Sequence, residues 1–129
     1  MTKWNLRPHR KPTGGKLNRL GKKTRSDRRP EPLFTRLGEL VRKTKRSIGG
    51  AVSYVTLSTN MANVTDPSTG KTKKVRILTV VESPSNPNFI RRNIITRGST
   101  VNTEAGKARV TSRPSRSGVV NAVLVEQKK

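Results

Sequence analysis

The side chains able to do acid–base or metal chemistry are few in this sequence and lie far apart. There is one histidine, no cysteine and seven acidic residues. The acidic residues are Asp27, Glu31, Glu39, Asp66, Glu82, Glu104 and Glu126. None of them pairs with another at a spacing typical of acid–base catalysis or of a divalent metal cage. We therefore expect a protein without enzymatic activity, cofactor, bound metal or small-molecule substrate.

Two glycine-containing runs partly match phosphate-binding loops. Residues 66–72 end in Gly-Lys-Thr, but the P-loop pattern requires a glycine where Thr65 stands and a helix afterwards. The residues after 72 have the pattern of a strand, so this run predicts a hairpin turn. Residues 13–16, Thr-Gly-Gly-Lys, lack a flanking strand as well. Their glycines would still let backbone amides approach a phosphate closely.

The charge balance is the strongest compositional signal. The 129 residues include 29 Lys and Arg against 7 Asp and Glu, a formal charge of +22. A compact body with this charge repels itself unless a polyanion neutralises it, which predicts a nucleic-acid partner. The absence of cysteine fits a reducing intracellular compartment. No apolar run approaches the length of a membrane span and the start lacks a secretory signal, so we expect a cytoplasmic protein without a membrane partner.

The N-terminal third has the composition of an arm. Residues 1–47 hold 16 Lys and Arg against three acidic residues, together with four of the eight prolines. Low hydrophobicity and high charge predict a segment that is disordered alone and orders on its partner. We place this basic, extended arm at residues 1–40. Its Trp4 suits either stacking on a base or packing on a protein surface, and His9, surrounded by cations, suits base stacking or phosphate contact.

The end of the arm has two interpretations. Leu33, Leu37, Leu40 and Val41 recur at helical spacing, but Gly38 interrupts them. The alternative makes residues 42–48 an edge strand that enters a hairpin through the Gly-Gly pair at 49–50, as a two-residue turn. We prefer the strand.

From residue 48 onward, valine, isoleucine and threonine dominate, which favours strands. A β-meander over Asn86 to Val125 organises this part, and its basic residues fall between apolar positions or at turns. Phe34, Tyr54 and Phe89 are interpreted as core or cover residues. Seven short strands predict a small closed or nearly closed all-β barrel over residues 41–126, followed by a basic tail at 127–129. The expected strands are Val52–Ser58, Ala62–Thr65, Lys73–Glu82, Phe89–Thr96, Thr100–Glu104, Lys107–Ser112 and Val119–Val125.

Several motifs occur in order along the chain: Lys11-Pro12-Thr13-Gly14-Gly15-Lys16, Thr35-Arg36-Leu37-Gly38, Gly49-Gly50, Val64-Thr65-Asp66-Pro67, Asn86 to Asn93, Gly106 to Pro114, and Gly118 to Leu124. In these motifs the chain resembles archaeal members of the small-subunit ribosomal protein eight family shared by archaea and eukaryotes. The resemblance covers nearly the whole chain and implies a non-enzymatic β-barrel with a basic N-terminal extension. It also implies binding to small-subunit ribosomal RNA, beside neighbouring small-subunit proteins. An architectural, histone-like DNA-binding protein is the alternative.

Charge and these motifs together select the residues expected to contact RNA. The contacts would be mainly to phosphates, which dominate affinity and make it depend on salt. The candidates are Arg7, Arg10, Lys11, Thr13, Gly14, Gly15, Lys16, Lys22, Lys23, Arg25, Arg28, Arg42, Lys43, Lys45, Arg46, Arg91, Arg92, Lys107, Arg109 and Arg113, with Trp4 and His9 as possible base-stacking residues.

Overall fold

The structure is a computed structural model, and it describes residues 8–18, 21–22, 24–28 and 32–125. The chain divides into two compact units, Met1–Pro32 and Leu33–Lys129. The second unit begins before the expected end of the arm, so residues 33–40 belong to the folded part. The expected basic tail at 127–129 lies outside the described residues. Within the described part, no helix is long and apolar enough to cross a membrane.

The described residues of the first unit form a closed turn and one short helix. The amide of Gly14 donates to the carbonyl of Lys11 over 2.9 Å, and the amide of Lys11 donates to the carbonyl of Gly15 over 2.8 Å. Arg10 and Lys16 form an isolated antiparallel bridge across this turn. Further along, a 3-10 helix η1 spans Arg25–Asp27. The glycine-containing run at 13–16 is thus part of a hydrogen-bonded turn.

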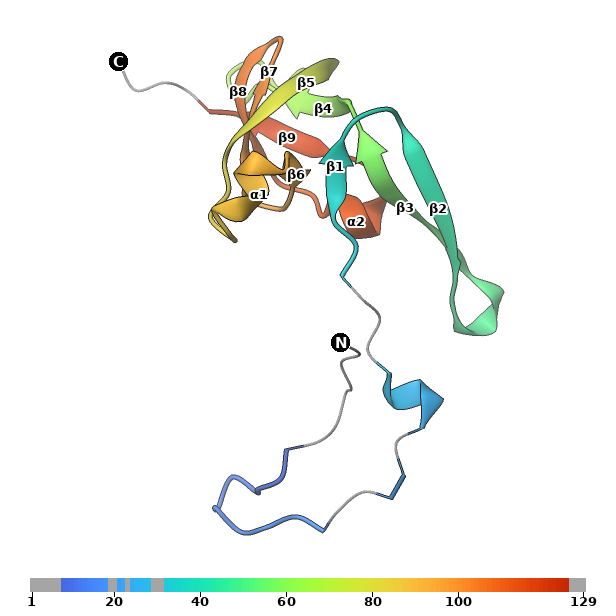
Figure 1. Cartoon of the computed structure of the whole chain (residues 1–129). Helices are drawn as coiled ribbons and strands as arrows, with labels where there is room; N and C mark the ends of the chain where they lie inside the picture. Colours follow the sequence, from blue (N-terminus) through green and yellow to red (C-terminus); the bar gives the residue numbers. More distant parts are fainter. Residues whose placement is uncertain (1–7, 19–20, 23, 29–31, 126–129) are drawn as a thin grey trace. The chain divides into compact units, whose positions relative to one another are not determined.

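The second unit is built around a closed barrel, as the sequence predicted (Figure 1). The barrel has five strands and not seven, because residues 52–59 and 94–95 pair in a separate sheet. Its strands are β4 (Met61–Thr65), β5 (Thr72–Glu82), β7 (Thr100–Thr103), β8 (Gly106–Val110) and β9 (Asn121–Leu124). Neighbouring strands pair antiparallel except β4 and β9, which run parallel and close the barrel. Residues 66–71 connect β4 to β5 as the predicted hairpin turn, in which the amide of Asp66 donates to the carbonyl of Lys71. Closure leaves these five strands without a free edge.

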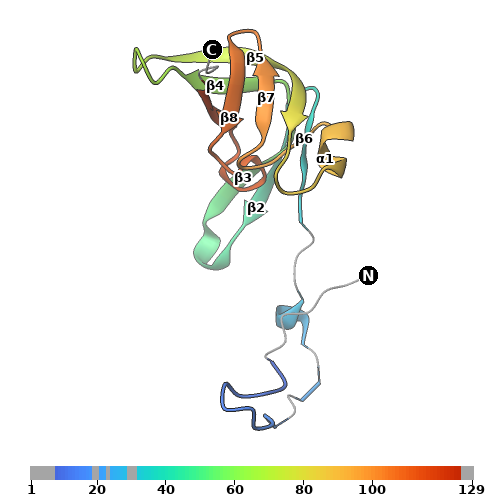
Figure 2. The same ribbon diagram turned by 90° about the vertical axis from the view of Figure 1, so that its left-hand side faces the viewer.

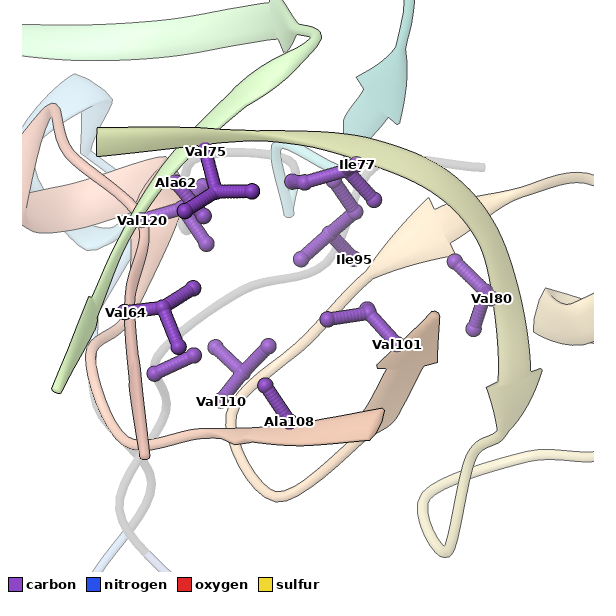
Figure 3. Packing of buried hydrophobic residues seen from close by; sticks show 11 residues of the cluster. Ala62, Val64, Val75, Ile77, Val80, Ile95, Val101, Ala108, Val110 and Val120 are labelled. Carbon is purple, nitrogen blue, oxygen red and sulfur yellow. The ribbon is translucent and has the colours of Figure 1, made fainter. Parts of the chain in front are cut away.

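Small β-branched side chains fill the barrel interior (Figure 3). Along β8, Ala108 and Val110 are buried while Lys107 and Arg109 are exposed, which confirms the predicted alternation. Ile77 on β5 is also buried, and its neighbour Leu78 faces outward. The interior is apolar and the outer face carries the charge because strand side chains alternate with a period of two. The cluster comprises Ala62, Val64, Val75, Ile77, Val80, Ile95, Val101, Ala108, Val110, Val120 and Ala122.

A second sheet adjoins the barrel in the strand order β2-β3-β1-β6. Its members are β1 (Thr35–Leu37), β2 (Val41–Arg46), β3 (Val52–Thr59) and β6 (Ile94–Ile95). β1 is parallel to β3 and antiparallel to β6. The structure therefore contains no helix over Leu33–Val41, and the preferred strand interpretation is confirmed. The hydrogen bonds of β1 with two distant strands explain why its leucine spacing did not produce a helix.

β2 and β3 form a long antiparallel hairpin that extends away from the barrel in both views (Figures 1 and 2). The connection is five residues, 47–51, and includes the 3-10 turn η2 (Ile48–Gly50), so the predicted two-residue turn was wrong. The amide of Ser47 donates to the carbonyl of Ala51 over 2.7 Å and joins the two ends of the loop. Gly49 and Gly50 both have positive φ, which is the backbone conformation that the prediction of a turn at this Gly-Gly pair required.

The predicted strand Phe89–Thr96 was wrong over its first half, so the β-meander comprises only β7, β8 and β9. The helix α1 (Asn88–Arg91) occupies this position, and only Ile94–Ile95 are extended, as β6. The side chain of Asn86 accepts a hydrogen bond from the amide of Asn88 over 2.9 Å and starts the helical turn. Asn93, at φ 47°, ends it. Local side-chain bonding thus overrides the strand propensity of Phe and Ile.

A second short helix, α2 (Pro114–Ser117), lies between β8 and β9 and packs against β3. It ends at Gly118, which has φ 75°. The carbonyl of Gly118 accepts a 2.6 Å hydrogen bond from the buried hydroxyl of Thr56. This contact ties the base of the β2–β3 hairpin to a segment 62 residues away in the chain.

Candidate nucleic-acid interface

The β2 strand places four of the candidate residues side by side. All six residues of β2 are exposed, and Arg42, Lys43, Lys45 and Arg46 are the basic ones. Because strand side chains alternate, the two arginines lie on one face of the hairpin and the two lysines on the other. The hairpin is therefore positively charged on both faces.

No acidic residue offsets this charge within the hairpin. Residues 40–59 contain neither Asp nor Glu. In the portion of the chain that the structure describes, none of these cations forms an ion pair. Exposed cations without an ion-pair partner can bind an anionic partner directly, since no contact within the chain has to be broken first.

Other candidates lie on the outer surface of the second unit. Lys107 and Arg109 project from β8, on the side of the strand opposite the barrel core. Arg91 and Arg92 are exposed at the end of α1. Arg113 is exposed immediately before α2, the helix that packs against β3.

The first unit presents its candidates on and beside the closed turn. Arg10, Lys11, Thr13, Gly14, Gly15 and Lys16 are all exposed, and so is His9. The guanidinium of Arg10 donates to the carbonyl of Gly14 over 2.9 Å and braces the turn. Because the amide of Gly14 already donates to Lys11, it is occupied within the turn. The side chains, more than this amide, are presented to a partner.

The remaining candidates of the first unit lie around η1. Lys22, Arg25 and Arg28 are exposed. The carboxylate of Asp27 accepts hydrogen bonds from the hydroxyl and the amide of Thr24, and these bonds lower the pKa of Asp27 below its ordinary value. This acid stabilises the helical turn. The candidates Arg7, Lys23 and Trp4 lie outside the described residues.

Several exposed basic residues were not among the candidates, and one aromatic residue was misassigned. Lys74 and Arg76 project outward from β5, and Arg36 is exposed on β1. The alternation of basic and apolar residues from 74 to 77 was the signal that could have found the β5 pair. Tyr54 was interpreted as a core or cover residue, but 59% of its surface is exposed. Phe34 and Phe89 contact each other, with ring centroids 5.1 Å apart.

A shallow cleft of about 180 Å³ joins the base of the hairpin to the barrel. Arg42 of β2 and Lys74 of β5 both line it, so the fold brings together two cations that are distant in sequence. No acidic residue is among its lining residues, which are Leu40, Arg42, Thr59, Asn60, Met61, Asn63, Lys74, Gly118, Val119 and Val120.

The two aspartates of the chain, Asp27 and Asp66, accept hydrogen bonds within turns. Asp66 accepts hydrogen bonds from the hydroxyl and amide of Ser68 and from the hydroxyl of Thr69, which lower the pKa of its carboxyl. Among the described residues, no three His, Asp or Glu side chains gather as metal ligands would. The chemistry that this surface offers is therefore the binding of anions by exposed cations.

Comparison with known proteins identifies the family. Residues 4–125 match the family model described as Ribosomal protein S8e. The chain belongs to the ribosomal protein S8e family. The predicted resemblance is thus confirmed, and because the S8e family consists of ribosomal proteins, so is the prediction that the chain is not an enzyme.

Similar S8e proteins come from several archaea. The chain is 44% identical to "Small ribosomal subunit protein eS8" of Methanospirillum hungatei over 95% of this chain and 98% of that protein. The protein of the same name from Picrophilus torridus is 44% identical over 97% and 100% of the two chains. The one from Methanosphaerula palustris is 43% identical over 95% and 98%.

Proposed function

We propose that this chain is a structural component of the small ribosomal subunit and binds its ribosomal RNA mainly through phosphates. The observation that carries the proposal is the exposed, unpaired set of cations on β2, in a chain whose relatives are named small ribosomal subunit proteins. The place of action is then the cytoplasmic ribosome, beside neighbouring small-subunit proteins.

In this proposal the two units act differently. The second unit is a compact body that carries cations on the hairpin and on the outer barrel surface. The N-terminal arm, ending before Leu33, supplies further cations around its closed turn. Ordering a chain segment costs about 1–2 kcal/mol per residue, so the arm should order only on RNA that offers many contacts.

The location is tested by sedimentation of a cell lysate at low magnesium, which separates the subunits. We expect the chain to travel with the small subunit at moderate salt and to leave it as salt rises. Sedimentation with chromosomal DNA would instead support the histone-like alternative. Competition between ribosomal RNA and duplex DNA for the purified chain separates the same two functions.

The phosphate mechanism is tested by the salt dependence of binding. If about ten phosphates are neutralised, log K falls by about 4 to 5 units between 50 and 200 mM salt. A variant in which Arg42, Lys43, Lys45 and Arg46 are all replaced by Gln should have a log–log slope smaller in magnitude by about 3. These side chains are fully outside the core, so the variant keeps the fold. An unchanged slope would show that the cations of β2 do not contact RNA phosphates.

A further inference from the structure

One face of the β2–β3 hairpin combines an aromatic side chain with two arginines. In the register of the hairpin, Arg42 lies opposite Thr56, Thr44 opposite Tyr54, and Arg46 opposite Val52. Because directly opposed residues share a face, Tyr54 has a guanidinium diagonally on either side of it. Diagonal neighbours lie about 7–8 Å apart, within reach of long side chains. We call this surface the Tyr54 face.

The ring of Tyr54 is largely exposed and makes no ring contact with a described residue. It is 59% exposed, and the neighbouring Val52 is 56% exposed. The aromatic contact found in the described residues joins Phe34 to Phe89 and does not involve Tyr54. The Tyr54 hydroxyl forms no hydrogen bond with a described residue. An exposed aromatic residue beside cations is typical of a surface that binds a partner.

The backbone beneath Tyr54 is held firmly. A side-chain carbon at Gly118 would lie only 2.8 Å from the carbonyl oxygen of Tyr54, so the two backbones are in close contact. Two residues further along β3, the hydroxyl of Thr56 donates to the carbonyl of Gly118. The tyrosine ring therefore projects from a fixed point, although the hairpin beyond it extends into solvent (Figures 1 and 2). Such a platform loses little entropy when a flat ligand stacks on it.

The positive charge around Tyr54 favours RNA over a protein surface as the partner that binds there. With no acidic residue from 40 to 59, a protein partner would need a dense acidic patch around an apolar centre. An unpaired nucleotide supplies both requirements, since its base has a face for stacking and its phosphates are anionic. Bases within a duplex are already stacked and are not available to the ring.

We propose that the Tyr54 face binds an unpaired nucleotide of RNA, with the Tyr54 ring stacked on the base and Arg42 and Arg46 contacting the flanking phosphates. This inference rests on the proposed RNA-binding function and specifies where single-stranded RNA is bound. The proposal distinguishes two contributions to the affinity for RNA. The arginines contribute salt-dependent attraction, whereas the ring contributes an attraction that salt hardly changes.

The first measurement uses the full chain without substitution. Tyr54 is the only tyrosine, so incorporation of 3-fluorotyrosine gives a single fluorine NMR signal from the Tyr54 face. The probes are an oligoadenylate of about 12 nucleotides, within the usual site size, and a fully paired RNA duplex. We expect the signal to shift with the oligoadenylate and to stay in place with the duplex. A signal that stays in place while the oligoadenylate binds would overturn the proposal.

The second measurement compares affinities of three variants. Tyr54→Ala should bind the oligoadenylate about 5- to 150-fold more weakly, with an unchanged salt slope and unchanged affinity for the duplex. Tyr54→Phe should bind as the parent does, because stacking needs the ring and not the hydroxyl. Leu78→Ala is the matched control, since Leu78 is likewise a large exposed side chain but lies on β5 of the barrel. It should leave both affinities unchanged.

The outcomes distinguish this inference from the function on which it rests. If the parent and Tyr54→Ala bind both RNAs equally and with steep salt dependence, RNA binding stands and the stacking site is refuted. The Tyr54 face would then be a protein contact. If Tyr54→Phe is as weak as Tyr54→Ala, the hydroxyl makes the contact and stacking is refuted. If no form of the chain binds RNA in a salt-dependent way, the proposed function fails together with the inference.

Discussion

Replacing Gly118 by Ala tests the contact that anchors the hairpin to the rest of the fold. A methyl group there would lie 2.8 Å from the carbonyl oxygen of Tyr54, whereas ordinary contacts begin near 3.4 Å. The two backbones would have to separate by about 0.6 Å. Such a shift pulls on the 2.6 Å hydrogen bond between the Thr56 hydroxyl and the Gly118 carbonyl, which is buried.

The expected cost is the sum of two terms. Alanine at φ 75° is strained by about 1–2 kcal/mol, because its side chain approaches a backbone oxygen. Weakening a buried hydrogen bond adds about 1–3 kcal/mol. Gly118→Ala should therefore lower the free energy of unfolding by about 2–5 kcal/mol. This is a large part of the roughly 5–15 kcal/mol that stabilises a typical domain.

Gly98→Ala is the matched control. Gly98 has φ 84°, but a side-chain carbon there would meet no atom within 4 Å. It therefore carries the backbone strain alone, about 1–2 kcal/mol. Urea denaturation followed by circular dichroism, at one salt concentration, measures both variants. If the two variants lower the free energy of unfolding by the same amount to within about 0.5 kcal/mol, the close contact between Gly118 and β3 adds nothing to the cost of the substitution. The argument that Tyr54 is held firmly would then be refuted.

Two further predictions concern the barrel and its first turn. Ile77→Ala should lower the free energy of unfolding by about 2–5 kcal/mol, because Ile77 is 3% exposed. Leu78→Ala, on the outer face, should change the free energy of unfolding by under about 1 kcal/mol. Equal effects of the two substitutions in urea denaturation would contradict the assigned faces of β5. The pKa of Asp66, measured by carbon NMR, should lie below 3.8, chiefly because Ser68 donates to it, and Ser68→Ala should raise it. Because the pKa of Asp66 is lowered in the folded chain, the stability that Asp66 contributes is complete above pH 3.8 and is lost as the pH falls through the pKa of the folded state. If Ser68→Ala left the pKa of Asp66 unchanged, the hydrogen bond from Ser68 would not be the cause of the lowered pKa.

The strands of the barrel were largely predictable because their evidence is local. Alternation in Lys107–Ser112 identified both the buried positions and the exposed cations of β8. Turn residues at 66–71 correctly separated β4 from β5. The first half of Phe89–Thr96 was mispredicted, since the side chain of Asn86 starts a helical turn that strand propensity does not reveal.

The candidate interface was predictable in charge but not in arrangement. The basic residues of β2 and β8 are exposed, as their pattern indicated. The position of Tyr54 was not predictable, because an aromatic residue in a strand is usually covered. Its exposure follows from the length of the hairpin, whose distal half has no third strand beside it.

The sequence by itself determined the charge, the strand-rich class and the side of β8 that faces outward, since composition and a period of two residues are properties of neighbouring positions. Tertiary structure decided which strands pair. The parallel closure of β4 on β9, the insertion of β1 between β3 and β6, and the bond from Thr56 to Gly118 all join distant segments. These contacts depend on shape and burial summed over the whole unit, so no local pattern specifies them.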